Sequence, residues 1–167
     1  MPARTLAAGL TLVVCALLCG NAWSDSLASF GLRTKDKNAC RLTDGRGFEA
    51  PTIVLMTGAY NKLSEEKVVV LEVIDTAINA GCDIDEPDEL GLSPLNAAIL
   101  YNEPALVERF LQAGADPYRK IVSSRTSIDG LDAFEFLHML MTKAPSQNRQ
   151  AVASLLDERS SREGRIE

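Results

Sequence analysis

The sequence is poor in the side chains that most enzymes use for catalysis. Its 167 residues include one histidine, and none of the four cysteines stands at a zinc-binding spacing from it. That histidine, His138, lies in the apolar run FEFLHML, where a core or groove position is the ordinary interpretation. The chain also lacks a G-x-S-x-G motif, a phosphate-binding loop and a G-x-G-x-x-G motif. We therefore predict a non-catalytic protein that needs no cofactor.

Positive charge is scarce as well. The chain has 17 lysine and arginine residues against 23 aspartate and glutamate residues, a formal net charge of -6. This excess of acid disfavours binding to nucleic acid and to anionic membrane surfaces. The densest acidic run, DIDEPDEL at 83–90, imitates a calcium-binding loop only in part, because Pro87 interrupts it and no glutamate stands at the twelfth position. We predict a solvated acidic loop there and no metal site.

Long hydrophobic runs are also rare, and the first one lies near the N-terminus. LAAGLTLVVCALLCG, at 6–20, is shorter than the roughly 20 residues that a transmembrane helix needs. Arg4 precedes it, and small residues stand at the −3 and −1 positions of a cut before Asp25, as in a secretory signal peptide. We predict a signal peptide at 1–24, export to the periplasm and no membrane insertion after cleavage.

The four cysteines divide into two pairs by position. Cys15 and Cys19 lie in the predicted signal peptide, where a lipoprotein anchor is the less favoured alternative because a bulky residue precedes each of them. Cys40 and Cys82 would remain after cleavage. Two cysteines in an oxidising compartment usually pair, so we predict a disulfide between them. The alternative is two separately buried thiols.

The rest of the chain contains mainly helical signals. Residues 25–47 are polar and punctuated by glycine, without sustained periodicity, and we expect an irregular N-terminal segment there. Residues 48–160 are richer in apolar side chains, and the charged tail 161–167 is expected to fray. No stretch alternates convincingly like a strand. Helices are expected to open near Pro51, Ser64, Pro94, Pro104, Ala133 and Ser146.

Two of the expected helix ends are alike, INAGCDID and LQAGADPY. Their glycines, Gly81 and Gly114, are 114 − 81 = 33 residues apart, which is the period of the ankyrin repeat. GLSPLNAA at 91–98 resembles that family's G-x-T-P-L-H-x-A motif, with serine in place of threonine and asparagine in place of histidine. LQAGAD at 111–116 resembles its L-x-x-G-A-D ending.

The resemblance implies an all-α fold. We expect a short ankyrin-type solenoid of helical hairpins over 48–160, with about three repeats and divergent terminal ones. The middle repeat, at about 88–119, carries the specific motifs. The first, at about 48–87, matches at its end, and the third, at about 127–160, matches loosely.

The ankyrin family generally binds proteins through its concave face and its connectors, which implies a partner-binding surface here. The motif positions and the two oppositely charged connectors supply these candidates: Asp85, Glu86, Asp88, Glu89, Leu90, Leu92, Leu100, Tyr101, Tyr118, Arg119, Lys120, Ile121 and Arg125. The loose third repeat would add Ile128, Leu131, Met139 and Leu140. The alternative is a shifted register, or an N-terminal segment that covers this surface.

Two functions fit a small, exported protein without catalytic groups. The first is a periplasmic inhibitor or immunity protein that binds and occludes a toxic secreted effector enzyme, such as an envelope-attacking lipase. The second is an envelope scaffold or adaptor that stabilises another periplasmic protein. Both rest on analogy, because a fold does not by itself determine a function.

Overall fold

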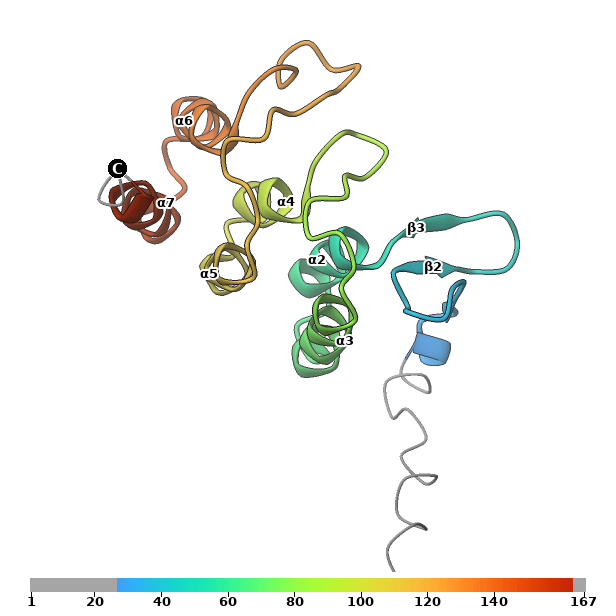
Figure 1. Cartoon of the computed structure of the whole chain (residues 1–167). Helices are drawn as coiled ribbons and strands as arrows, with labels where there is room; N and C mark the ends of the chain where they lie inside the picture. The colour runs from blue at the N-terminus through green and yellow to red at the C-terminus, as the bar shows by residue number, and fades with distance from the viewer. Residues whose placement is uncertain (1–26, 164–167) are drawn as a thin grey trace, which may run out of the picture.

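The computed structural model describes residues 27–163, which form a row of helical hairpins with a small sheet at one end (Figure 1). The predicted signal peptide, its cleavage site and the alternative lipid-bearing cysteines lie outside the described residues, as do residues 164–167 of the tail. The helices are α2 (Thr52–Lys62), α3 (Lys67–Asn79), α4 (Pro94–Tyr101), α5 (Pro104–Gln112), α6 (Ala133–Lys143) and α7 (Gln150–Glu163). The strands are β1 (Arg33–Thr34), β2 (Arg41–Thr43) and β3 (Glu49–Pro51).

Helices α2 to α7 form three antiparallel pairs (Figure 1). α2 packs on α3 and α4 on α5, while α2, α4 and α6 pack side by side as one row. α5 and α7 also pack together, in a second row that includes α3 (Figure 1). The connectors that precede α2, α4 and α6 project from the same side of the first row. We call α2, α4 and α6 the inner helices and the other three the outer helices.

Local chemistry explains why the middle pair forms where it does. The Ser93 hydroxyl accepts a hydrogen bond from the Asn96 amide at 3.2 Å, which caps α4, and Pro94 has no amide to leave unpaired at the first helical position. Asn102 ends α4 in the left-handed conformation, and Pro104 begins α5. The expected helix starts therefore agree with the structure to within a few residues.

The expectation of a purely α-helical protein is wrong. β1, β2 and β3 form an antiparallel sheet in that order, and it lies largely within 25–47, where we expected irregular structure. The loop between β2 and β3 closes because the Asp44 carboxylate accepts hydrogen bonds from the amides of Arg46 (2.7 Å) and Phe48 (3.0 Å). Strands of two or three residues are too short to show alternation in the sequence, so pattern analysis missed them.

The sheet and the helices share one continuous apolar core. Leu42 of β2 is fully buried and joins the cluster that continues through all three helix pairs. Cys40 and Cys82 form the predicted disulfide, which ties the start of β2 to the end of the first helix pair. Within residues 27–163, no helix combines the length and the apolar character needed to cross a membrane.

Candidate protein-binding surface

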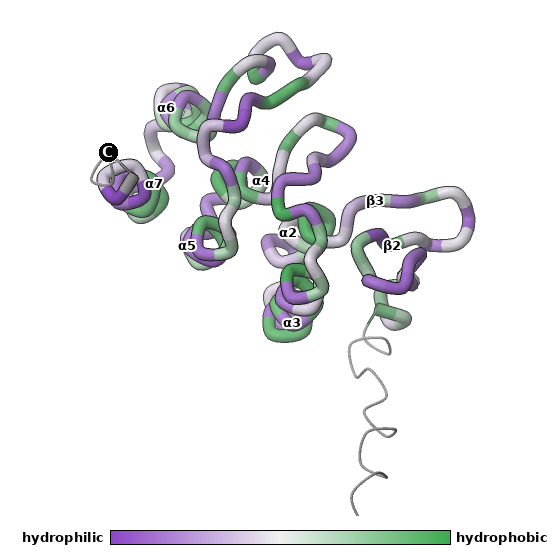
Figure 2. The backbone as a smooth tube through the Cα atoms, viewed as in Figure 1, coloured by the Kyte–Doolittle hydropathy of each residue, from purple (hydrophilic) through white to green (hydrophobic). Residues whose placement is uncertain are grey.

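Three projecting loops lie next to one another along the inner helices. They are the hairpin tip (44–48), the first finger (83–92) and the second finger (116–132), and Figure 1 shows them on one side of the molecule. Hydrophilic and hydrophobic stretches follow one another along both fingers in Figure 2. A mixed surface of this kind is typical of the rim and anchor positions of protein interfaces.

Bonds across these loops hold the hairpin and the first finger together. The disulfide joins Cys40 to Cys82 immediately before the first finger. The Arg41 guanidinium bridges Glu49 of β3 and Glu86 of the first finger. These ion pairs are partly exposed, so we assign them a role in orientation and little net stability.

The first finger contacts the second through the half-buried carboxylate of Asp85. Asp85 accepts a hydrogen bond from the backbone amide of Asp116 at 3.2 Å. Burial raises the pKa of Asp85, and the neighbouring acids Asp83 and Asp116 raise it further, against the opposing influence of the Asp116 amide and of Arg119. The contact therefore holds a carboxyl group whose ionisation is penalised in the folded state.

The second finger is closed on itself and anchored to α6. The Ile121 amide donates to the Leu131 carbonyl at 2.9 Å, which pairs the two sides of the loop. The Lys120 ammonium lies 2.9 Å from Asp132 and 2.7 Å from Glu135, and both hydrogen bonds raise its pKa. Asp132 and Glu135 also form the capping box that starts α6. The positive charge of Lys120 is therefore already paired with two carboxylates of the same chain.

A groove of about 830 Å³ lies between the hairpin, α2 and the first finger. Its lining is mainly apolar and includes Phe48, Leu55, Ala59, Leu63, Leu90 and Tyr101. The groove is open to solvent along one side of the inner helices. Its size falls in the range of typical ligand pockets, so it can hold several side chains of a partner.

A second depression, of about 540 Å³, lies on α6 at the other end of the inner row. Its lining comprises Ser127, Leu131, Phe134, Glu135, His138 and Met139. The Tyr118 ring stacks on Phe134 with 5.4 Å between centroids, so the second finger covers one edge. His138 is exposed and lines this depression, so of the two expected positions, core or groove, it takes the groove. Residues 27–163 contain no cluster of three metal-binding side chains.

The structure places most of the predicted partner-binding residues at the surface. The exposed ones are Glu89, Leu90, Tyr118, Arg119, Lys120 and Arg125, and the half-buried ones are Asp85, Glu86, Asp88, Leu100 and Tyr101. In the third repeat, Leu131, Met139 and Leu140 are half-buried, whereas Ile128 is buried. The groove brings five of them together with the hairpin: Glu86, Asp88, Glu89, Leu90 and Tyr101.

Three predicted binding residues are corrected by their burial. Leu92, Ile121 and Ile128 are 4%, 2% and 9% exposed and belong to the core. The Asp88 side chain accepts from the Leu92 amide at 2.9 Å and the Asp88 amide donates to the Leu92 carbonyl at 2.9 Å, which folds the finger back and turns Leu92 inward. In the second finger, the hydrogen bond from the Ile121 amide to the Leu131 carbonyl likewise folds the loop back and turns Ile121 inward.

Sequence reasoning missed the groove residues contributed by the hairpin and α2. Phe48 is 41% exposed although it is large and apolar, and it follows the polar turn that joins β2 to β3. Leu55, Ala59 and Leu63 recur every four residues, which is the spacing of one helix face. That spacing was readable in the sequence, but the wall opposite it comes from a sheet that was not expected.

Comparisons with known proteins give a partial match. No family model matches the chain, and no solved structure matches it. A stretch of 78 residues, 47% of the chain, is 33% identical to part of an ankyrin and IPT/TIG repeat-containing protein of Schizosaccharomyces pombe. The chain spans 7% of the length of that protein. The match supports an ankyrin-like relation. It covers about half of the chain, so the partner and activity of this protein remain matters for proposal.

Proposed function

We propose that this chain is a non-catalytic module that binds another protein through its inner helices and projecting loops. The observation that carries the proposal is the 830 Å³ groove, whose mainly apolar lining includes two large side chains that are more than a third exposed, Phe48 and Leu90. Exposed apolar surface next to a hollow generally marks a contact site. The partial similarity to an ankyrin-repeat protein supports a protein partner.

We further propose that the partner is a secreted effector enzyme, such as a lipase that attacks the cell envelope, and that binding occludes its active site in the periplasm. The signal-like N-terminus supports export, and the Cys40–Cys82 disulfide suits an oxidising compartment. A small domain that covers an active site needs no chemistry of its own. Its affinity depends on a few well-packed anchors.

The test is co-purification of the protein with the product of the adjacent gene, followed by inhibition of that enzyme. Leu90→Asp places a charge in the groove and should abolish both binding and protection of cells. Val68→Asp makes a similar change at an exposed position of α3, outside the lining of the groove, and should leave both intact. Equal behaviour of the two variants, or no protection by the wild-type protein, would contradict the inhibitor role.

The envelope-scaffold alternative predicts a different result. Deletion of the gene would then cause a complex of periplasmic proteins to disassemble, without making cells sensitive to a toxin. The same pair of variants separates this outcome from inhibition, because Leu90→Asp would remove the complex but leave toxin sensitivity unchanged.

A further inference from the structure

We propose that the groove between the hairpin, α2 and the first finger binds a segment of the partner protein in which apolar side chains stand next to a lysine or arginine. The inference rests on the proposed protein-binding function and names the chemistry that the groove selects. It depends on three features of the groove, namely its floor, its lips and the charges on its rim.

The floor is one stripe of α2. Leu55 and Ala59 lie on α2, and Leu63 directly follows its last residue. All three are half-buried, line the groove and recur at intervals of four residues, so they form an apolar strip along the helix and its C-terminal end. At 1.5 Å per residue the strip is about 12 Å long. That length matches about two turns of a helix or about four residues of extended chain. A short peptide segment therefore fits into the groove, whereas the flat surface of a whole domain is too wide to enter it.

The lips hold apolar side chains outward. Phe48 stands at the hairpin tip and Leu90 on the first finger, and Tyr101 lines the groove from α4. Exposure to water raises the free energy of large apolar groups on two neighbouring loops, and a partner that covers them lowers it. The segment that binds must accordingly carry apolar side chains.

The charges around the rim are not balanced. Arg41 is paired with Glu49 and Glu86, and Lys35 is also paired with Glu49, so these two cations and two carboxylates neutralise one another internally. Asp88 accepts hydrogen bonds from the amides of Leu90 and Leu92 through one oxygen, Oδ1, and keeps its negative charge.

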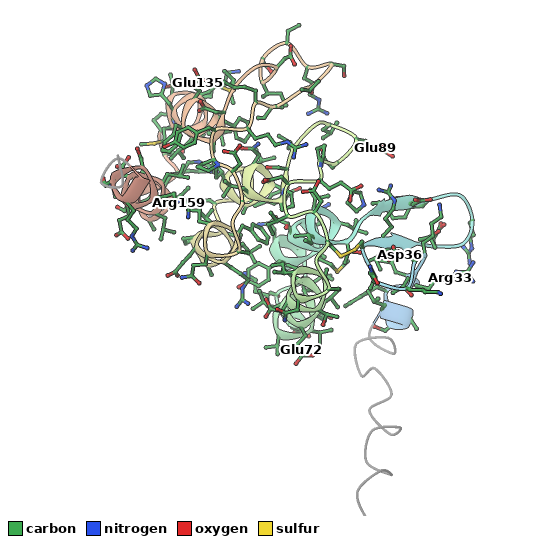
Figure 3. All side chains as sticks on the ribbon, viewed as in Figure 1. Arg33, Asp36, Glu72, Glu89, Glu135 and Arg159 are labelled. Atoms are coloured by element: carbon green, nitrogen blue, oxygen red, sulfur yellow. A yellow bond between two sulfur atoms is a disulfide. The ribbon has the colours of Figure 1, made fainter. Side chains whose placement is uncertain are left out.

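Glu89 is an exposed carboxylate on this rim, and within residues 27–163 it is unpaired, with no hydrogen bond or ion pair. Figure 3 shows Glu89 at the tip of the first finger. Together with Asp88 it presents two negative charges to the groove. Lys62 lines the groove from the end of α2, which favours placement of the cationic end of the segment at the finger.

The walls are held in place before any partner arrives. The Cys40–Cys82 disulfide and the Arg41–Glu86 ion pair connect the hairpin to the first finger across the base of the groove. A groove that does not need to be ordered on binding loses less entropy, so a short segment is enough for measurable affinity.

The experiment is selection of a displayed library of random short peptides on the purified protein. Enriched peptides should carry apolar residues adjacent to lysine or arginine, and their affinity should fall as the salt concentration rises. Glu89→Lys should weaken an enriched peptide about tenfold, because it replaces an attraction by a repulsion at the rim. Glu72→Lys makes the same change on outer helix α3, away from the groove, and should leave the affinity unchanged (Figure 3).

Three outcomes would overturn the inference. One is enrichment of acidic peptides or of none. Another is equal weakening by Glu89→Lys and Glu72→Lys. The third is an enriched peptide that still binds when Ala59→Arg fills the floor of the groove while the melting temperature is unchanged. None of these results requires an enzyme partner, so failure of the peptide selection and failure of co-purification are separate findings.

Discussion

Gly91 of the first finger lies directly against the backbone carbonyl of Val122 in the second finger. A Cβ atom added to Gly91 would stand 2.0 Å from the Val122 carbonyl oxygen, and the backbone of Gly91 has φ +83°. Both the close approach and the left-handed conformation require glycine. The spacing of the two fingers is therefore set by contact between their backbones.

The first prediction concerns this contact. Gly91→Ala should destabilise the protein by more than the roughly 1 kcal/mol that a left-handed alanine costs, because the two fingers must also move apart. Gly81→Ala is the matched control, since Gly81 has φ +80° and nothing within 4 Å of an added Cβ. Urea unfolding of both variants measures the difference. Equal losses would show that the fingers separate without cost.

Local signals in the sequence predicted the helices well. Ser93, Pro94 and Pro104 act through their own backbone neighbours, so their positions in the sequence are sufficient evidence for the helix ends. Burial of Leu92 and Ile121 depends instead on how each finger folds back on itself. Such pairing across a loop leaves no periodic trace, which is why both residues were misplaced on the surface.

The groove was unpredictable for the same reason. One wall is a helix stripe that the sequence displays at Leu55, Ala59 and Leu63, but the opposite wall needs the hairpin and the register between β2 and β3. The disulfide was predicted from cysteine count and compartment alone, and the structure confirms it. The sequence carried no signal that this bond would also position a wall of the groove.

The second prediction concerns that disulfide. The bond closes a loop with a sequence separation of 42 residues, and its loss should destabilise the protein by up to about 4 kcal/mol. A reductant should lower the melting temperature of the wild type and leave that of the double variant Cys40→Ala, Cys82→Ala unchanged. The reductant should also weaken any groove-binding peptide. An unchanged wild-type melting temperature under full reduction, verified by thiol alkylation, would argue against this role.

The third prediction concerns pH. Burial raises the pKa of Asp85 above its ordinary 3.8, so the folded state binds this proton more tightly than the unfolded chain does. The stability that Asp85 contributes is therefore present in acid and is lost as the pH rises through its folded-state pKa.

Asp85→Asn removes that titration while it keeps an oxygen for the Asp116 amide. Stability of the variant relative to wild type should rise between about pH 3 and pH 7. Both proteins will lose stability in acid through Asp36 and Asp132, whose pKa values are lowered, and the difference between them isolates Asp85. Denaturant unfolding across this range is the measurement. A difference that is constant or that shrinks toward neutral pH would contradict the assignment.

The fourth prediction separates folding from binding. Leu95 of α4 is buried in the core, and Leu95→Ala should destabilise the protein by about 2–5 kcal/mol because it leaves a cavity there. Arg119 is exposed on the second finger, so Arg119→Glu should change the free energy of unfolding by no more than about 0.5 kcal/mol. The same reversal should weaken the complex with the partner, because a charge on the rim steers association. Chemical unfolding and binding kinetics on both variants test this division. Comparable destabilisation by the two changes would mean that the second finger belongs to the folding core, and its proposed contribution to the partner surface would have to be withdrawn.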